Sequence, residues 1–237
     1  MCIRDSYIAS YELKSRVDIS ELNYTVHTFG YEPLRRENEK VEYLCNSIIK
    51  SPYYYNFSEI LKTHEKSLRY KDENHKTAID MIVEFVKKID NDIRYIELSE
   101  IDDGIKRFIV VADTNADNLD ITNYGEGLQR IFEIALSFAY CKNGVICIDE
   151  FETAIHYSLL VDFTRFIQEL SDMFNVQVFI TTHSKECISA FVDNKYRNDN
   201  IAFFTMTRDR EKKIQSIYYD AKSLQNELEQ DLEVRGW

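Results

Sequence analysis

Val145-Ile146-Cys147-Ile148-Asp149-Glu150 is the stretch that decides the fold. Its continuous apolar run predicts a strand buried on both faces, as in a parallel sheet that helices cover on both sides. In such a sheet ligands bind at the carboxyl ends of the strands, so Asp149 and Glu150 are expected to project toward a cleft. An acidic pair can also simply end a strand and begin a solvated turn, and the pair alone does not decide between these readings.

A second apolar strand, Val176 to Ile180, is followed by Thr181-Thr182-His183-Ser184. Ser184 is expected to be the N-cap of a helix that runs to about Val192. If the two strands are neighbours, His183 and Glu150 face one site, where an imidazole could donate a hydrogen bond to a phosphate oxygen. Taken by itself, His183 is more simply read as a histidine satisfied by backbone at a capped helix start.

The third motif is the turn Tyr124-Gly125-Glu126-Gly127, which precedes a predicted amphipathic helix. Glycines before a helix let backbone amides and the positive helix end approach an anion closely. The alternative is a tight turn in which Gln129 and Arg130 are solvated first-turn residues. Gly-x-Gly by itself is weak evidence for a phosphate site.

Composition fits a folded chain: 44% of the 237 residues are hydrophobic and 13% are aromatic. Since no apolar stretch approaches the roughly 20 residues of a membrane helix, no membrane partner is expected. The five cysteines are irregularly spaced, which indicates reduced thiols and a cytoplasmic location. A net charge of −12 argues against a generally basic nucleic-acid surface and leaves only a local basic groove for that partner.

The chain divides near residue 75 into two regions, and the sequence pattern predicts secondary structure and motifs more clearly in the second than in the first. Residues 1–75 mix short alternating pieces with a predicted helix from Asn38 to Lys50 and the aromatic cluster Tyr53 to Phe57. Residues 76–237 carry all three motifs. Their other predicted elements are a helix near 78–86, a hairpin of strands 93–101 and 107–112, a helix after His156, strands near 201–207 and 213–218, and a closing helix over 221–232.

Together and in this order, the motifs resemble those of ABC-type ATPase heads, a class of P-loop NTPases with AAA-type relatives. Such heads occur in structural-maintenance-of-chromosomes-like (SMC-like) proteins, and the compact OLD-like ATP-binding proteins are the most similar. The resemblance covers about residues 75–237. It implies an α/β fold with a largely parallel sheet flanked by helices, an antiparallel hairpin portion and no Walker A segment. Residues 1–75 would be a remnant of an N-terminal lobe, and residues 76–237 the C-terminal part of the head.

The resemblance also implies roles for individual residues. Asp149 and Glu150 match the Walker B strand, so Asp149 would order Mg²⁺ through water and Glu150 would be the catalytic carboxylate. His183 matches the switch histidine that contacts the terminal phosphate of ATP. A further segment takes the place of the ABC signature loop of that family. It supplies the candidate nucleotide-binding residues Asn123, Gly125, Glu126, Gly127, Gln129 and Arg130.

Two further positions follow from the same resemblance. His156, in the loop after Walker B, is a candidate at the dimer interface. This loop usually contains a glycine where Ala154 stands here, and Asn123 replaces the serine that usually precedes the signature glycines. These departures leave the catalytic groups in place.

None of the six glycines stands in a Gly-x-x-x-x-Gly-Lys-Ser/Thr loop, the Walker A loop that carries most nucleotide affinity. We therefore expect a truncated reading frame that begins after this loop, with a leader, Met1 to Ser6, that is not native. The fragment alone is expected to be inactive, and the full-length protein to be an ATPase.

The function implied is that of an ATP-binding and ATP-hydrolysing domain that works as a nucleotide-dependent homodimer in DNA repair or phage defence. The alternative is an ATP-driven dimerisation switch for a separate effector protein, with little turnover. Two rival classes stay open: a zinc hydrolase with Asp149, Glu150, His156 and His183 as ligands, and a nucleic-acid binder that stacks bases on Tyr53 to Tyr55.

Overall fold

The structure is a computed structural model that describes residues 7–11, 32–33, 43–44, 46–49, 55–69, 71, 76–101, 104–113, 118–196, 200–208, 213–232 and 234. The chain forms two compact units. Met1–Ser51 and Cys141–Trp237 make up the first, and Pro52–Tyr140 makes up the second. This division cuts the chain at other positions than the predicted boundary near residue 75. That boundary concerned where the ATPase motifs begin, and it stays a prediction.

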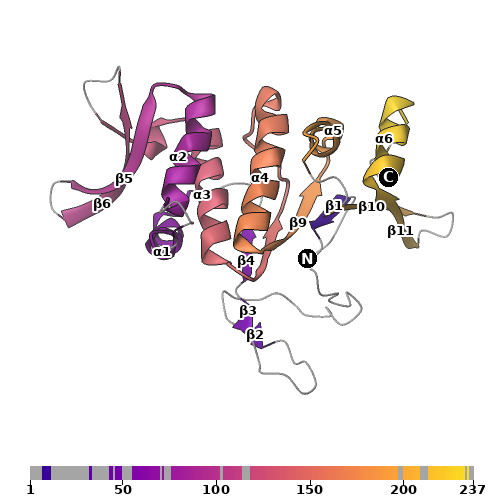
Figure 1. Cartoon of the computed structure of the whole chain (residues 1–237), viewed down its shortest axis with the longest axis horizontal. Coiled ribbons are helices and arrows are strands. Elements are labelled where there is room, and N and C mark those ends of the chain that lie inside the picture. Colours follow the sequence, from indigo (N-terminus) through magenta and orange to yellow (C-terminus); the bar gives the residue numbers. More distant parts are fainter. Residues whose placement is uncertain are drawn as a thin grey trace. The chain divides into compact units, whose positions relative to one another are not determined.

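A six-stranded mixed sheet in the order β11-β10-β1-β9-β8-β4 organises the first unit (Figure 1). Its strands are β1 (Tyr7–Tyr11), β4 (Asn46–Ile49), β8 (Val145–Ile148), β9 (Gln177–Thr182), β10 (Ile201–Arg208) and β11 (Ile214–Asp220). The β4, β8 and β9 strands pair in parallel, whereas β1, β10 and β11 pair antiparallel. A separate antiparallel pair joins β2 (Glu32–Pro33) to β3 (Tyr43–Leu44). The predicted α/β class, with parallel and antiparallel portions, is confirmed.

The two strands that precede the candidate site are direct neighbours. In the parallel ladder Ile146 pairs with Val178 and Ile148 pairs with Ile180, and all four side chains are buried. Parallel strands end at the same edge of a sheet, so the residues after Ile148 and Ile180 lie side by side. The condition that would bring Glu150 and His183 to one site is therefore met.

The predicted helix from Asn38 to Lys50 is wrong in the part that the structure describes. Tyr43–Leu44 and Asn46–Ile49 are strands, and Ile48 and Ile49 pair with Cys147 and Ile148 of β8. Apolar spacing over a short run does not separate helix from strand, and pairing with a neighbouring strand decides the outcome.

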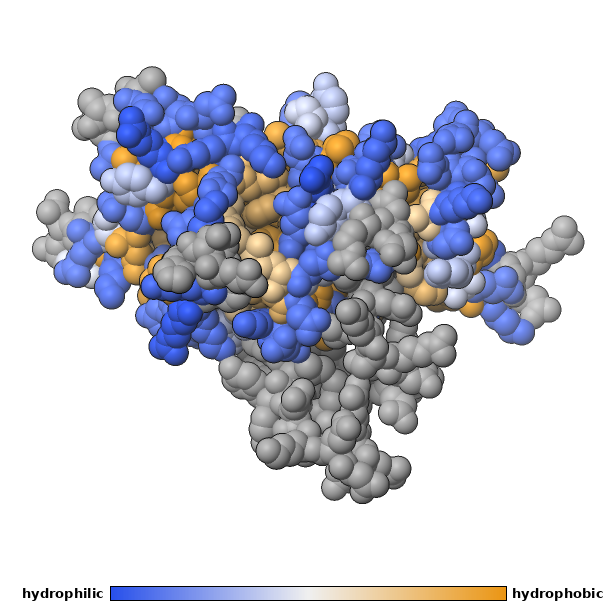
Figure 2. All heavy atoms as spheres, viewed as in Figure 1, coloured by the Kyte–Doolittle hydropathy of each residue, from blue (hydrophilic) through white to orange (hydrophobic). Residues whose placement is uncertain are grey.

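The helices of the first unit are α4 (Leu160–Phe174), α5 (Lys185–Asp193) and α6 (Ala221–Glu229), with a short 3-10 turn η4 (Tyr157–Leu159) before α4. As predicted, Ser184 caps α5, because its hydroxyl accepts the backbone N–H of Cys187 at 3.1 Å. The α6 helix begins at the N-cap Asp220 and buries only Leu224. Figure 2 accordingly shows mainly hydrophilic residues over α6.

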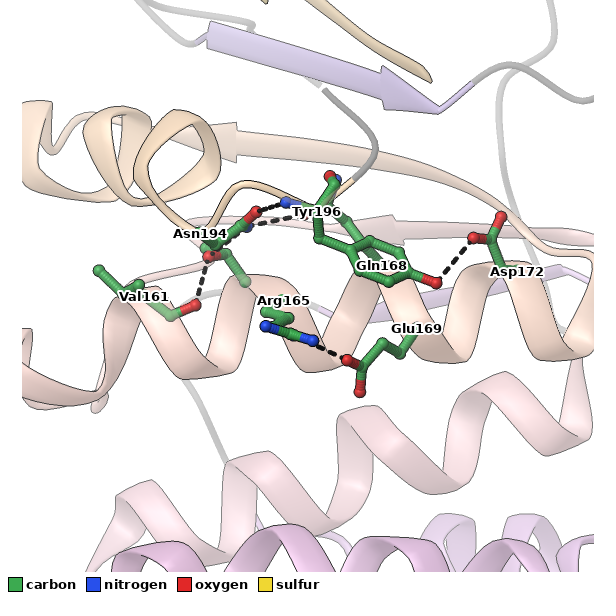
Figure 3. A network of polar contacts seen from close by, with 8 residues as sticks. Val161, Arg165, Gln168, Glu169, Asp172, Asn194 and Tyr196 are labelled. Carbon is green, nitrogen blue, oxygen red and sulfur yellow. Dashed lines mark hydrogen bonds and ion pairs between the residues drawn. The ribbon is translucent and has the colours of Figure 1, made fainter. Parts of the chain in front are cut away.

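A network of buried polar side chains holds the end of α5 on α4 (Figure 3). Asn194 Nδ2 donates to Thr164 Oγ1 at 2.9 Å and to Gln168 Oε1 at 2.7 Å, while Asn194 Oδ1 accepts the backbone N–H of Tyr196 at 2.8 Å. Gln168 Nε2 donates to the carbonyl of Tyr196, and the Tyr196 hydroxyl donates to Asp172 Oδ2 at 3.0 Å. A connected network of this kind fixes the packing of the two helices, since breaking one bond leaves a buried group unpaired.

The second unit packs three helices with a three-stranded antiparallel sheet in the order β5-β6-β7. Its elements are α1 (Phe57–Ser67), α2 (Ala78–Ile89), β5 (Ile93–Ile101), β6 (Ile105–Ala112), β7 (Leu119–Asp120), the 3-10 turn η3 (Ile121–Asn123) and α3 (Glu126–Tyr140). The predicted hairpin is confirmed, and Gly104 in its turn has φ +77, a conformation that favours glycine. Phe108 is fully buried against Phe57, His64 and Phe132.

Three further sequence predictions concern the aromatic cluster, the cysteines and membrane helices. Tyr53 and Tyr54, proposed to stack bases, lie outside the described residues. Cys141, Cys147 and Cys187 are free thiols, and Cys2 and Cys45 lie outside the described residues. Within the described ranges, none of the helices is both long and apolar enough to cross a bilayer.

Candidate functional site

Thr181 contacts both members of the acidic pair at the carboxyl end of β8: the Asp149 carboxylate and the Glu150 backbone. Its Oγ1 donates to Asp149 Oδ1 at 2.7 Å and accepts the backbone N–H of Glu150 at 2.9 Å. The Asp149 N–H donates to the carbonyl of Ile49 at 2.8 Å, and Phe151 N–H donates to the carbonyl of Thr181 at 3.0 Å. The acidic pair is thus fixed to the neighbouring strands on both sides.

Glu150 has an uncommon backbone conformation. Its φ is +45, in the left-handed region that non-glycine residues seldom occupy. The bond to Thr181 on one side and the Thr153 N–H to Glu150 carbonyl bond of 3.0 Å on the other hold it there. Thr153 Oγ1 also donates to Glu150 Oε2 at 3.3 Å. Strained backbone of this kind is common where a side chain must point in one direction, so Glu150 is a good candidate for a reacting group.

The loop after Glu150 contains a second residue of this type. Ala154 has φ +65 and is exposed, at the position where the resembled family usually has glycine. His156 follows as the N-cap of η4, where its Nδ1 lies 2.8 Å from Ser158 Oγ, and its ring is exposed and contacts that of Tyr157. Both residues lie on the surface, which suits the predicted interface role of His156; that role stays a prediction.

His183 is exposed and follows the end of β9 directly. Its backbone N–H donates to Glu152 Oε1 at 3.0 Å, which links it to the loop after β8. Ser184, the next residue, donates its N–H to Thr182 Oγ1 at 3.1 Å before α5 begins. His183 and Glu150 therefore follow neighbouring strands whose ends are cross-linked by hydrogen bonds.

The signature-like loop belongs to the second unit. Asp120 caps η3, because its Oδ1 accepts the backbone N–H of Thr122 at 2.9 Å, and Asn123 is exposed at the end of the turn. The helix α3 begins at Glu126, so Gly127 lies inside its first turn and the predicted start after Gly127 is wrong by two residues. Gly125 and Glu126 are exposed immediately at this helix start.

Gln129 and Arg130 are buried, which contradicts the alternative that they are solvated first-turn residues. Gln129 Nε2 donates to the carbonyl of Tyr124 at 2.9 Å and so holds the loop against the helix. Arg130 is fully buried. Gln129 supports the loop from within; the predicted contact of both residues with nucleotide stays untested.

The oxygen groups at the end of β8 suit magnesium better than zinc. Magnesium takes one or two carboxylates together with water and substrate phosphates, and the exposed Asp149 carboxylate, oriented by Thr181, fits that pattern. Within the described part of the chain, no three histidine, cysteine or acidic side chains lie close enough to hold a metal by themselves. The zinc hydrolase alternative therefore gains no support from these residues.

A sheet that places an Asp-Glu pair after one strand and a histidine after its parallel neighbour is the arrangement expected of a P-loop ATPase head, the class that the sequence predicts. The chain matches the AAA ATPase domain family over residues 5–188, and it belongs to that family. The match includes most of residues 1–75, where the sequence revealed no motif, so the family likeness reaches further toward the N-terminus than predicted.

Two relatives share part of this sequence. An ATP/GTP phosphatase of Helicobacter pylori is 32% identical over 111 residues, which are 44% of this chain and 30% of that protein. An uncharacterised protein of Methanocaldococcus jannaschii is 37% identical over 70 residues, 30% of this chain and 61% of that protein. The chain thus spans less than two thirds of the length of either relative.

Solved structures of SMC ATPase heads show a weak overall similarity. One, from work on ATP-driven dimerization and DNA-stimulated activation of SMC ATPases, has a TM-score of 0.47 and 11% identity, covering 73% of this chain and 96% of that chain. An Smc head bound to the C-winged helix domain of ScpA has a TM-score of 0.45 and 12% identity, covering 63% and 44%. At this level of similarity, function has to be argued from the residues of the site.

Proposed function

We propose that this chain is the catalytic and partner-facing part of an ATPase head that hydrolyses ATP as a nucleotide-dependent homodimer. The observation that carries the proposal is the cross-linked end of β8 and β9, where Thr181 holds the Asp149 carboxylate and the Glu150 backbone N–H, and His183 follows β9 directly. Phosphoryl transfer needs a held metal, charge compensation and a positioned nucleophile, and these residue types supply them.

Each side chain has a distinct part in the proposed reaction. Glu150, half-buried and held in a fixed backbone conformation, accepts a proton from the water that attacks the terminal phosphate. Asp149, exposed and oriented by Thr181, holds Mg²⁺ through water. When bound, Mg²⁺ neutralises charge on the phosphates. His183 donates a hydrogen bond from its exposed imidazole to the terminal phosphate.

Gly125 supports the part of the proposal that concerns a second head. Its φ is not in the left-handed region, and a Cβ built on it would meet no atom within 4 Å. The fold therefore does not require glycine there. A bare backbone at the exposed start of α3 allows the close approach of an anion, and we assign this surface to the ATP held by the partner head. Asn123, Glu126 and Gly127 border the same exposed turn.

The name of the Helicobacter pylori relative, an ATP/GTP phosphatase, supports removal of the terminal phosphate as the reaction. We propose that the head is cytoplasmic and OLD-like, with a role in DNA repair or phage defence. A separate effector protein would read the dimer.

The test compares Glu150→Gln with the matched control Glu169→Gln in the full-length protein; Glu169 lies on α4 in a surface ion pair with Arg165. The Glu150 variant should bind ATP and stay dimeric by sedimentation after wild type has returned to monomer. A Glu150 variant that dissociates as fast as wild type would refute the proposal. If the wild-type dimer instead persists for many times longer than one round of ATP hydrolysis takes, the protein is a dimerisation switch with little turnover.

A further inference from the structure

Glu152 links the loop after β8 to the histidine that follows β9. Its Oε1 accepts the backbone N–H of His183 at 3.0 Å, across 31 positions of sequence. Its Oε2 is buried and has no hydrogen-bond partner among the residues that the structure describes. Among the described residues, the Glu152 carboxylate therefore accepts a hydrogen bond from the backbone of His183 alone.

Stability alone does not explain a carboxylate at this position. A buried carboxylate oxygen without a donor has lost its water and gained nothing in return, which disfavours the folded state. The bond to His183 needs only an acceptor oxygen, which glutamine would also supply, so the feature to be explained is the acceptor at this position. Buried polar groups that are left unsatisfied in this way call for a functional explanation.

The position of the His183 imidazole depends on its backbone. The ring is exposed, and among the described residues no hydrogen bond to either ring nitrogen is present. On one side Thr182 ends β9, and on the other Ser184 begins the cap of α5. Between these two points, the His183 N–H bond to Glu152 holds the peptide before the side chain, and the Ser184 N–H bond to Thr182 Oγ1 holds the peptide after it.

The same loop reaches the surface a few residues later. Phe151 is fully buried and stacks on Phe163 with ring centroids 4.9 Å apart, which anchors the start of the loop. His156 and Tyr157 are exposed, and Tyr157 is 72% accessible. Glu152 thus lies between a buried anchor and an exposed surface, and it contacts the histidine segment from there.

We infer that Glu152 is a positioning residue for His183. Through its bond to the His183 backbone, Glu152 couples the exposed loop around His156 to the His183 imidazole. A displacement of this loop moves the Glu152 carboxylate and, through the 3.0 Å bond, the His183 peptide. The inference rests on the proposed function, since it gives the His183 imidazole a place at the terminal phosphate. It adds a residue that acts through His183 and does not touch ATP.

The experiment measures ATP hydrolysis by the full-length protein with Glu152→Ala, Glu152→Gln and His183→Ala, singly and combined. Misplacing a group that binds the reacting phosphate lowers kcat by about 10–100-fold, so we expect that loss for Glu152→Ala with KM for ATP little changed. Glu152→Gln keeps the acceptor oxygen and should restore kcat to within a few-fold of wild type. In the His183→Ala background, Glu152→Ala should cause no further loss, because both changes remove one function.

Two kinetic outcomes would overturn the inference: a Glu152→Ala protein with wild-type kcat, or a loss of kcat on Glu152→Ala that is as large in the His183→Ala background as in the protein with His183. Hydrogen exchange supplies a readout that does not need turnover. The His183 amide should exchange faster in Glu152→Ala and at the wild-type rate in Glu152→Gln, and equal rates in all three proteins would also contradict the role. The Glu150→Gln variant distinguishes failure of the proposed function from failure of the inference about Glu152. If Glu150→Gln hydrolyses ATP at the wild-type rate, the proposed function fails. If Glu150→Gln does not hydrolyse ATP but Glu152→Ala hydrolyses it at the wild-type rate, only the inference about Glu152 fails.

Discussion

Replacing Ala154 by glycine should stabilise the protein, although most alanine to glycine changes destabilise. Ala154 has φ +65, and its side chain is exposed. A residue with a Cβ pays about 1–2 kcal/mol to occupy the left-handed region. Glycine removes that cost and loses little packing, because the methyl group faces solvent.

The unfolded chain offsets part of this gain. Glycine raises the entropy of the unfolded state, which costs the folded protein about 0.4–1 kcal/mol. The middle values of these two ranges give a net gain of about 0.8 kcal/mol for Ala154→Gly. For a chain of this size that corresponds to a rise in Tm of roughly 1–4 °C.

Thermal unfolding followed by circular dichroism measures this difference, with Ala221→Gly as the matched control. Ala221 is the first residue of the α6 helix, so it carries no left-handed strain and its replacement should lower Tm. Opposite signs for the two variants support the reasoning, since the unfolded-state cost is common to both. A fall in Tm for Ala154→Gly as large as that for Ala221→Gly would refute it.

The remaining predictions concern a side-chain clamp and a buried histidine. Thr181→Val removes the hydroxyl that holds Asp149 and the Glu150 N–H. Chemical denaturation should therefore show that the free energy of unfolding falls by about 1–3 kcal/mol, and Thr181→Ser should restore most of this loss. Burial lowers the pKa of His64 below its ordinary value of 6.5, so the unfolded state binds a proton more readily and stability should fall as pH drops below 6.5. Urea unfolding at pH 7.5 and 5.5 measures this fall in stability, and His64→Leu should remove part of the difference in unfolding free energy between the two pH values. If the pH dependence of His64→Leu equals that of wild type, His64 is not its source.

The parts of the site that local sequence determines were predictable. An apolar run followed by Asp149-Glu150 gives the β8 strand and its acidic end, and a serine before a helical pattern gives the Ser184 cap. These features depend on residues within a few positions of each other. The sequence could give the pairing of β8 with β9 only as the condition for Glu150 and His183 to share a site, and in the structure the two strands do pair.

The contacts between distant segments could not be predicted. The roles of Thr181 and Glu152 depend on a register that sets residues about thirty positions apart within hydrogen-bond distance. The sequence contains only one hint for each: a hydroxyl two residues before the histidine, and a carboxylate two residues after Glu150. The burial of Arg130 likewise results from how α3 packs, which helical spacing does not reveal for a charged residue.

The central claim, that Glu150 is the catalytic carboxylate of an ATPase, is tested most directly by the release of inorganic phosphate from ATP. In the full-length protein, Glu150→Gln should lower the rate by about 10²–10⁴-fold, because a general base is lost, while ATP binding and Tm stay close to wild type. Glu169→Gln should release phosphate at the wild-type rate. Phosphate release by Glu150→Gln within a few-fold of wild type would contradict the account.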